Sequence, residues 1–472
     1  MNRIQFLTSE QAQKIHEDTL RLLAEVGVKL THAGAREMLL DHGAQYRDDR
    51  VMFPPDLVAR CVKQCPPMVT LVGRDPNKTL ELGPGGTSAH NVGGVPNVYE
   101  PTFGTRRPAT REDNVTVARL LDALANVNSV ASMFTPSDVD PRTMPLWMYF
   151  DTVANTTKPA HAPGTQTGRD VRALAEMALI ACPETRLEHH GISISPISPL
   201  TFPDGIVDAI LEAARAGFTL SPLPCPIMGA TAPMSIAGAL VLQNAEVLAT
   251  IVLAQIVSPG LPIIYHGRLS TMDPRSGMSV WGNPEIGMIS AATAQIAQYY
   301  NLPSDVYGFC TNALSINIQN GYERAINGLL PVLAGASQIS GIGEMDGGVM
   351  SSLVQIVIDN EILASILRVQ QSFQVNDDAL AFEVIKSVVD GGPGNFLAEM
   401  HTVQYLRQGE VLKIDLAERT GWIEGETKGQ TEITQRAEER ALKLIAEHEA
   451  QPLSEEQRTA MLAVIESAAS EA

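Results

Sequence analysis

Polar side chains come directly after two short apolar runs between Tyr307 and Gly348. The first run is Val306 to Cys310, the second is Gln338 to Ile342, and a helix-type segment, Gly321 to Ala334, separates them. The polar residues that follow the two runs are Asn312, Asn317, Gln319, Glu344 and Asp346. In a parallel α/β protein, side chains just beyond the strands face the substrate. The segment therefore predicts part of a ligand site.

Further candidate site residues come directly after the other short apolar runs. They are Ser137, Asp138, Thr165, Gln166, Ser198, Met228, His266 and Arg268, and the aromatic residues near these loops are Tyr265, Trp281, Tyr307 and Phe309. Few of these side chains are charged and several are aromatic. Such a pocket suits a small, partly apolar ligand that can be cationic, since aromatic faces attract cations.

The residues give little support for a serine nucleophile, a metal site or a phosphate-binding loop. A serine triad would need a nucleophile elbow of the type G-x-S-x-G, which is missing. Glu344 and Asp346 near His266 could bind a metal, but an acid pair in a glycine loop is more typical of a turn or helix cap, so no metal is predicted. The glycines after residue 340 lack a following basic residue, which favours turn geometry over phosphate binding. No residue is predicted to act by covalent catalysis.

The elements that must position these groups alternate between short apolar runs and longer helical segments. The predicted strands are Val130 to Thr135, Pro159 to Pro163, Gly191 to Ser195, Phe218 to Leu223, Leu261 to Tyr265, Asp305 to Phe309 and Gln338 to Ile342. Continuous apolar strands between helices indicate a parallel sheet covered on both faces. We predict an α/β fold of the (β/α)8 type with one strand not located, because an open sheet would be expected to show a G-x-G-x-x-G turn.

Three regions are predicted along the chain. Residues 1–110 form an N-terminal α/β subdomain whose first helix is capped by Ser9. Residues 111–425 form the barrel, and its first helix opens with a capping box between Thr110 and Asp113. Residues 426–472 form a charged helical tail that packs on the barrel or on a neighbouring subunit, which would make the protein a homo-oligomer.

Composition narrows the partners and the compartment. The formal net charge of −19 argues against nucleic acid and anionic membranes as partners. The most membrane-like stretch, Ile236 to Val257, contains Gln243, Asn244 and Glu246, so a buried core helix is favoured. Five cysteines without a dense framework, and no signal-peptide pattern, indicate the cytoplasm.

Several ordered segments resemble the trimethylamine methyltransferase family of corrinoid-dependent methyltransferases, in its non-pyrrolysine branch, which includes glycine betaine methyltransferases. The matching segments are GTRRPATREDNVTVARLLDAL at 104–124, DVDPRTMPLWMYFDTVANTTKP at 138–159, SPISPLTFPDG at 195–205, the long run from Pro224 to Gly267, GNPEIGMISAATAQIAQYYNLPSD at 282–305 and QNGYERAINGLLPVLAGAS at 319–337. Together they span nearly the whole chain.

The resemblance implies a (β/α)8 barrel that moves a methyl group from a methylated amine to Co(I) of a separate corrinoid-binding protein, in one-carbon metabolism or methanogenesis. The corrinoid is implied to belong to that partner, with no cofactor held by this chain. Alignment on Gln319, Gly321, Tyr322 and Glu323 places Leu314 at or near the pyrrolysine of the trimethylamine enzymes. An aliphatic side chain there points to quaternary amines, which need no covalent activation because they release a neutral amine.

For a betaine substrate, the resemblance assigns roles to the residues above. Tyr265, Trp281, Tyr307 and Phe309 would hold the trimethylammonium head, with Glu344 and Asp346 at a distance. His266 or Arg268 would bind the carboxylate, Leu314 would form a wall near the methyl group, and Asn312 and Gln319 would shape the pocket. His90, His161 and Tyr99 are weaker candidates. Two alternatives remain open, namely a non-catalytic binder of quaternary amines and an unrelated metal-dependent barrel lyase or hydrolase.

Overall fold

Eight parallel strands close into a barrel in the computed structural model, which describes residues 3–390, 392, 394–419, 421 and 431–470. The strands are β6 (Ser88–Asn91), β9 (Val130–Ala131), β10 (Ala160–His161), β11 (Gly191–Ile194), β13 (Thr219–Pro222), β14 (Tyr265–Gly267), β17 (Ser304–Tyr307) and β18 (Gln338–Ile342). Each strand pairs in parallel with the next one in this order, partly through single bridges, and β18 pairs with β6 to close the ring. The predicted (β/α)8 fold is confirmed.

The strand that the sequence did not locate is β6, which lies inside residues 1–110. Ser88 pairs with Gln338 of the last strand, and His90 bridges to Ser129 ahead of β9. The barrel therefore begins before residue 110, where the sequence set the start of the catalytic region. Its run SAHN carries three polar residues in four, so it lacks the continuous apolar pattern of a buried parallel strand.

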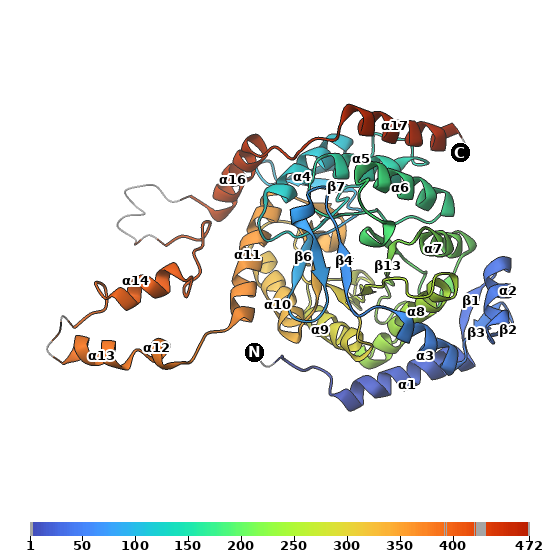
Figure 1. Ribbon diagram of the computed structural model, residues 1–472, viewed down its shortest axis with the longest axis horizontal. Coiled ribbons are helices and arrows are strands. Elements are labelled where there is room, and N and C mark those ends of the chain that lie inside the picture. The colour runs from blue at the N-terminus through green and yellow to red at the C-terminus, as the bar shows by residue number, and fades with distance from the viewer. Residues whose placement is uncertain (1–2, 391, 393, 420, 422–430, 471–472) are drawn as a thin grey trace.

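The outer layer of the barrel consists of eight helices, which surround the strands in Figure 1. They are α4 (Arg111–Ala123), α5 (Met144–Ala154), α6 (Gly168–Ala181), α7 (Asp204–Ala216), α8 (Ile236–Val257), α9 (Pro284–Tyr299), α10 (Ile318–Ala334) and α11 (Leu353–Gln371). The predicted capping box at the start of α4 is present, since the Asp113 carboxylate accepts from the backbone N–H and hydroxyl of Thr110.

Helix α8 is the helix that is long and apolar enough to cross a membrane, and it lies buried in the protein. The side chains of Gln243, Asn244 and Glu246 are fully buried, and each finds hydrogen-bond partners. Glu246, for example, accepts from Ser198 Oγ at 2.8 Å and from the Leu200 N–H at 2.8 Å. These partners make α8 a core helix of the barrel.

Short elements at the N-terminus pack beneath the barrel. They are α1 (Ser9–Glu25), β1 (Val28–Leu30), α2 (Ala33–Asp41), β2 (Gln45–Arg47), β3 (Arg50–Met52) and α3 (Pro55–Gln64), followed by the hairpin of β4 (Val69–Leu71) and β5 (Leu80–Leu82). Strand β1 also pairs with β12 (Thr201–Phe202) of the barrel region. The cap of α1 is Thr8, and the prediction of Ser9 was wrong by one position, because the side chain of Gln11 completes a capping box with Thr8.

Small hairpins and turns extend beyond the carboxyl ends of the barrel strands. They are formed by β7 (Asn97–Glu100) with β8 (Thr105–Pro108), β15 (Thr271–Met272) with β16 (Ser279–Val280), and β19 (Glu344–Met345) with β20 (Met350–Ser351). We call this end of the barrel its mouth.

After α11 the chain leaves the barrel and later returns to it. Helices α12 (Asp377–Leu380), α13 (Phe382–Val389) and α14 (Met400–Arg407) project away from the barrel in Figure 1, and we call them the arm. Helices α16 (Ile433–Glu447) and α17 (Glu455–Ser470) pack on the barrel, where α16 contacts α4 and α11 and α17 contacts α6. His448 Nε2 lies 2.8 Å from Asp122 of α4. The predicted boundary between residues 425 and 426 lies outside the described residues.

Candidate functional site

A cavity of about 410 Å³ opens at the mouth of the barrel. Its wall contains residues from β6, β10, β11, β13, β14, β17 and β18 together with the loops that follow them. Its hydroxyl side chains are Ser132, Thr135, Ser193, Ser195, Ser221 and Ser340, and its apolar side chains include Met144, Met148 and Trp281. This is the position at which (β/α)8 enzymes hold their substrates.

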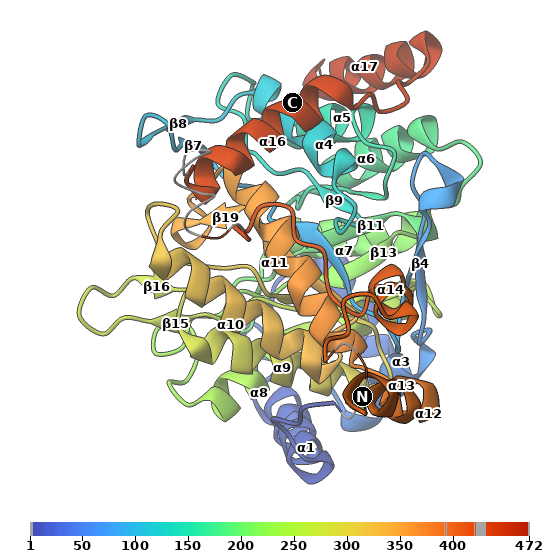
Figure 2. The same ribbon diagram turned by 90° about the vertical axis from the view of Figure 1, so that its left-hand side faces the viewer.

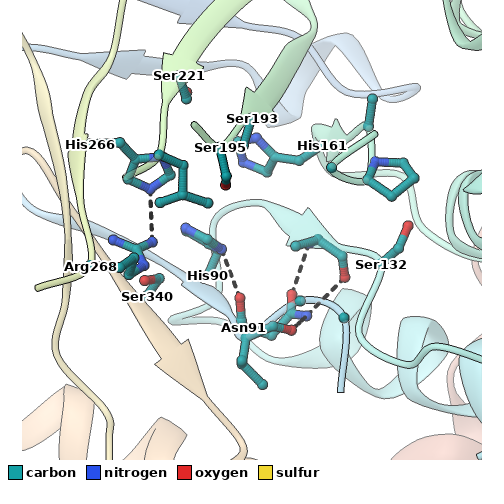
Figure 3. Close-up of a pocket in the computed structure, with 18 of the residues that line it drawn as sticks. His90, Asn91, Ser132, His161, Ser193, Ser195, Ser221, His266, Arg268 and Ser340 are labelled. Atoms are coloured by element: carbon teal, nitrogen blue, oxygen red, sulfur yellow. Dashed lines mark hydrogen bonds between the residues drawn. The ribbon is translucent and has the colours of Figure 1, made fainter. Parts of the chain in front are cut away.

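A compact cluster of charged and imidazole groups lies at the base of the cavity. The Asp305 carboxylate is 2.8 Å from His90 Nε2 and 2.5 Å from His266 Nε2. Arg268 Nη2 is 2.7 Å from the same nitrogen of His266 and 3.4 Å from the Asp305 carboxylate. All four side chains are at least nine-tenths buried. Figure 3 shows His90, His266 and Arg268 converging, with His161 nearby.

Hydrogen bonding fixes the orientation of the His90 ring. Its Nδ1 lies 2.8 Å from the backbone carbonyl of Asn91, and its Nε2 lies 2.8 Å from Asp305. The ring is therefore held between two oxygen atoms at the base of the cavity. Arg268 lies on the other side of the Asp305 carboxylate and supplies a guanidinium cation there.

Burial and neighbouring charges shift the ionisation of the other members. Burial disfavours the Asp305 carboxylate, but His266, His90 and Arg268 outweigh this and hold its pKa well below the usual range. Burial lowers the pKa of His266 to about 4, with the Arg268 charge acting in the same direction. Burial and the proximity of His90 lower the pKa of His161 to about 3. Asp305 is therefore ionised, and His266 and His161 are neutral, at neutral pH.

The charged base is separated from the mouth by an aromatic pair. Asp305 and Tyr307 are two residues apart on β17, so both face the interior and Tyr307 lies one layer nearer the mouth. The rings of Trp281 and Tyr307 have centroids 5.1 Å apart, and the Arg268 guanidinium lies 4.9 Å from the Tyr307 centroid. The cavity is thus layered, with the Arg268 guanidinium and its Asp305 partner at the base and aromatic and methionine side chains above.

Asn312 holds Trp281 in this wall. Its Oδ1 accepts from the backbone N–H groups of Trp281 at 2.6 Å and Gly282 at 3.0 Å. The Glu323 carboxylate in turn accepts from the Asn312 N–H at 3.1 Å and from the side chain of Gln319 at 2.9 Å. Asn312 and Gln319 were predicted to shape the pocket, and the structure places them behind its wall.

Four of the predicted site residues line the cavity, namely His266, Arg268, Trp281 and Tyr307. Tyr265 points away from it, because its hydroxyl donates to Asn244 of α8. Phe309 is fully buried in a core cluster with helices α10 and α11. An aromatic cage of four rings is therefore not formed by these residues, and Trp281 and Tyr307 supply its aromatic part.

The remaining predicted residues lie outside the cavity wall. Leu314 is 65% exposed in the loop after β17, so it forms no wall beside a ligand here. Glu344 is buried behind the wall, where it accepts from the Thr311 N–H at 2.8 Å, and burial raises its pKa to about 8. Asp346 lies 3.7 Å from Arg106 of the β7–β8 hairpin. These acids shape loops at the mouth.

The central residue that the sequence did not single out is Asp305. It was predicted to begin a strand, and a charged residue inside an apolar strand was itself a signal. His90 and His161 were weaker candidates, and both line the cavity. His90 was only a weaker candidate because its strand, β6, lies within the residues that were predicted to form a separate N-terminal subdomain. Tyr99 lies in the β7–β8 hairpin, outside this cavity.

The cluster also meets the geometric requirement for a metal site, since ligand atoms of His90, His266 and Asp305 lie within 4.8 Å of one another. Arg268 Nη2 lies 2.7 Å from His266 Nε2, so this nitrogen has a cationic neighbour from the protein itself, whereas His266 Nδ1 is buried without a hydrogen-bond partner among the described residues.

The fold and the site define a (β/α)8 protein with a small-molecule cavity at its catalytic face. The family model "Trimethylamine methyltransferase (MTTB)" matches residues 1–472, and the chain belongs to this family of methyltransferases. It is 32% identical to the trimethylamine methyltransferase MttB of Desulfitobacterium hafniense (strain DSM 10664 / DCB-2) over 97% of this chain and 93% of that protein. It is 29% identical to a glycine betaine methyltransferase of Desulfitobacterium hafniense (strain Y51), over 94% of this chain and 92% of that protein.

Among solved structures, the chain is similar to the monomethylamine methyltransferase MtmB of Methanosarcina barkeri. The TM-score is 0.52 at 13% identity, and the match covers 92% of this chain and 86% of that one. At this identity the likeness concerns the fold, and it agrees with the barrel described above.

Proposed function

We propose that this chain transfers a methyl group from a quaternary amine bearing a carboxylate, such as glycine betaine or a related betaine, to Co(I) of a separate corrinoid protein. The observation that carries the proposal is the layering of the cavity. Arg268 places a guanidinium cation at its base, and Trp281, Tyr307 and two methionines lie nearer the mouth. The similarity to a glycine betaine methyltransferase supports the same substrate class.

A betaine fits this layering in one orientation. Its carboxylate would bind at the base, where Arg268 offers charge-assisted hydrogen bonds. Its trimethylammonium head would then contact Trp281 and Tyr307, whose faces stabilise a cation by about 0.5 to 2 kcal/mol each. The methyl groups would point to the mouth, from which the methyl acceptor arrives. The opposite orientation would place a cation against Arg268.

In the proposed reaction, the electron pair of Co(I) forms a bond to one methyl carbon while the C–N bond breaks. The pair of that C–N bond stays on nitrogen, so the products are methyl-Co(III) and a neutral tertiary amine. No proton and no covalent enzyme adduct are required. The barrel contributes binding, alignment of the methyl group and exclusion of water, which are effects of orientation and desolvation.

A tertiary amine would require activation by an electrophilic residue, and no side chain in the cavity wall has that chemistry. Leu314, which the resemblance places at or near the pyrrolysine of the trimethylamine enzymes, points in the same direction. Leu314 is exposed and lies outside the cavity wall, so it bears on the substrate because it is not an electrophile and not because it contacts the ligand.

The acceptor protein is proposed to dock at the mouth, and the chain itself is proposed to hold no corrinoid. Exposed apolar side chains surround the mouth, as expected for a binding surface. They include Phe103, Ile197, Met234, Met278 and Leu314, which come from loops after five different barrel strands. The five free cysteines accord with a cytoplasmic setting.

The proposal is tested with the reduced corrinoid protein and a panel of methylated amines. Absorbance should report conversion of Co(I) to methyl-Co(III) with glycine betaine or another betaine, and not with trimethylamine. Conversion with the tertiary amine alone would refute the substrate class. Thermal stabilisation by a betaine without methyl transfer would identify a non-catalytic binder.

A further inference from the structure

Three serine side chains stand together in the cavity wall on β11 and β13, strands that lie side by side in Figure 2. Ser193 of β11 and Ser221 of β13 are paired residues of these parallel strands, about 5 Å apart. Ser195 directly follows β11 and shares the face of Ser193, since residues two apart on a strand point the same way. All three line the cavity, and in Figure 3 they lie between His266 and His161. We call them the serine patch.

The hydroxyl groups of the serine patch have no hydrogen-bond partner in the part of the chain that the structure describes. The other serines of the wall do have partners, since Ser132 Oγ donates to the Met148 carbonyl at 3.1 Å and Ser340 Oγ to the Val306 carbonyl at 3.4 Å. Ser221 is only 3% exposed. A buried hydroxyl without a partner is costly, so we expect a ligand in the cavity to supply one.

The opposite wall of the cavity differs from the serine patch. In the closed order of the barrel strands, β6 lies across from β13. Asn91 of β6 uses its amide within the protein, where Nδ2 donates to the carbonyls of Val92 and Ala131 and Oδ1 accepts from the Ala131 N–H. Thr135 also has a hydroxyl without a partner among the described residues, but it stands alone, beyond β9 toward the mouth. Free hydroxyl groups are therefore concentrated on one side of the cavity.

The chemistry of the serine patch suits a neutral group. A serine hydroxyl can donate one hydrogen bond and accept others, and so can a hydroxyl group of a ligand. A carboxylate only accepts, and Arg268 on the neighbouring strand end offers it the stronger, charge-assisted hydrogen bonds. A trimethylammonium group has no proton to donate. The serine patch therefore matches a part of the ligand that lies between these two charged ends.

We propose that Ser193, Ser195 and Ser221 bind a hydroxyl group on the carbon chain of the substrate, so that the site favours a betaine with a hydroxyl between its carboxylate and its trimethylammonium head. This inference rests on the proposed function, because Arg268 and the aromatic pair fix the two charged ends. With both ends fixed, one enantiomer directs its hydroxyl at the serine patch. The other enantiomer directs it at the opposite wall, so the site distinguishes the two.

The full-length chain is titrated in a calorimeter with three ligands that differ at one position. They are the two enantiomers of carnitine, which have a hydroxyl between the charged ends, and γ-butyrobetaine, which lacks it. One enantiomer should bind roughly 2- to 10-fold more tightly than the other, as expected for one hydrogen bond between neutral groups. γ-Butyrobetaine should bind less tightly than the preferred enantiomer. The enantiomers have the same size and charge, so a difference between them reports the position of the hydroxyl alone.

The same titrations with two serine variants identify the residues responsible. Ser193→Ala and Ser221→Ala should each weaken binding of the preferred enantiomer, by roughly 2- to 10-fold, and bring the two enantiomers closer in affinity. The affinity for γ-butyrobetaine should stay as in the wild type. The matched control is Ser276→Ala in the β15–β16 turn, where the hydroxyl donates to Asp273 outside the cavity. It should change none of the three affinities.

The outcomes separate this inference from the proposed function. Equal affinity for the two enantiomers, with all three betaines bound, would overturn the role of the serine patch and leave the proposed function standing. An equal loss for all three ligands in the serine variants would also overturn it, because the patch would then hold the carboxylate or support the wall. If no betaine bound to the wild-type chain, both proposals would fail together.

Discussion

Arg268→Met removes the guanidinium from the base of the cavity and keeps a side chain of similar length. The four described hydrogen bonds of Arg268 all use its two Nη atoms, which bind Gly267, His266 and Asp305. Asp305 keeps His90 and His266 as partners in the variant, so the barrel should still fold. What the variant lacks is the cation that we propose for the substrate carboxylate.

The expected effect follows from the value of one hydrogen bond to a charged group. Such a bond contributes about 1.5 to 3 kcal/mol, which corresponds to roughly 10- to 150-fold in a dissociation constant. We therefore expect glycine betaine to bind Arg268→Met weaker by about that factor. Choline has the same trimethylammonium head and no carboxylate, so its dissociation constant should change little. Titration calorimetry measures both.

The matched control is Arg275→Met, which removes an exposed arginine from the β15–β16 turn and should change neither affinity. An equal loss for betaine and choline in Arg268→Met would mean that Arg268 acts only by supporting the cavity. Unchanged betaine affinity would refute the assignment of the carboxylate to this end of the cavity.

Three further predictions concern the wall, the core and the charged cluster. Trp281→Leu should weaken betaine and choline binding alike, by roughly 2- to 30-fold for the loss of a cation–π contact of about 0.5 to 2 kcal/mol; calorimetry showing no change for either would remove Trp281 from the site. Burial raises the pKa of Glu246 to about 7 in the folded protein, from 4.5 in the unfolded chain. Between these two pH values the unfolded chain has released this proton and the folded protein still holds it. The free energy of unfolding therefore falls as pH rises from about 4.5 to about 7. Glu246→Gln should therefore lose less thermal stability than wild type between pH 5 and pH 8, and parallel melting curves would contradict that pKa. The proposed reaction uses no metal held by this chain, so methyl transfer should survive dialysis against EDTA; loss of activity that zinc restores would instead make His90, His266 and Asp305 metal ligands.

The barrel was predictable because most of its strands are continuous apolar runs between amphipathic helices. The predicted strand from Gln338 to Ile342 agrees with β18 in the structure. Strand β6 was missed because Ser88, His90 and Asn91 serve the barrel interior, and a strand that supplies site residues loses its apolar pattern. Strands that supply polar residues to a site are therefore the hardest to predict from the pattern of apolar residues.

The site was only partly predictable because order along the strand does not give the direction of a side chain. Tyr265 and His266 are neighbours on β14, yet one contacts α8 and the other lines the cavity. Successive side chains of a strand point to opposite faces, so a shift of one position along the strand separates a core residue from a ligand-binding one. Side chains in loops do not alternate in this regular way, so the directions of Leu314 and Asp346 could not be predicted from their positions in the sequence.

The fate of a labelled methyl group distinguishes methyl transfer from every other role of this barrel. Glycine betaine with N-trideuteromethyl groups is incubated with this chain and the Co(I) corrinoid protein, and both products are analysed by mass spectrometry. We expect one trideuteromethyl group on cobalt for each dimethylglycine that retains the other two. An unlabelled corrinoid, or a label on cobalt that appears only when a tertiary amine is the donor, would contradict it.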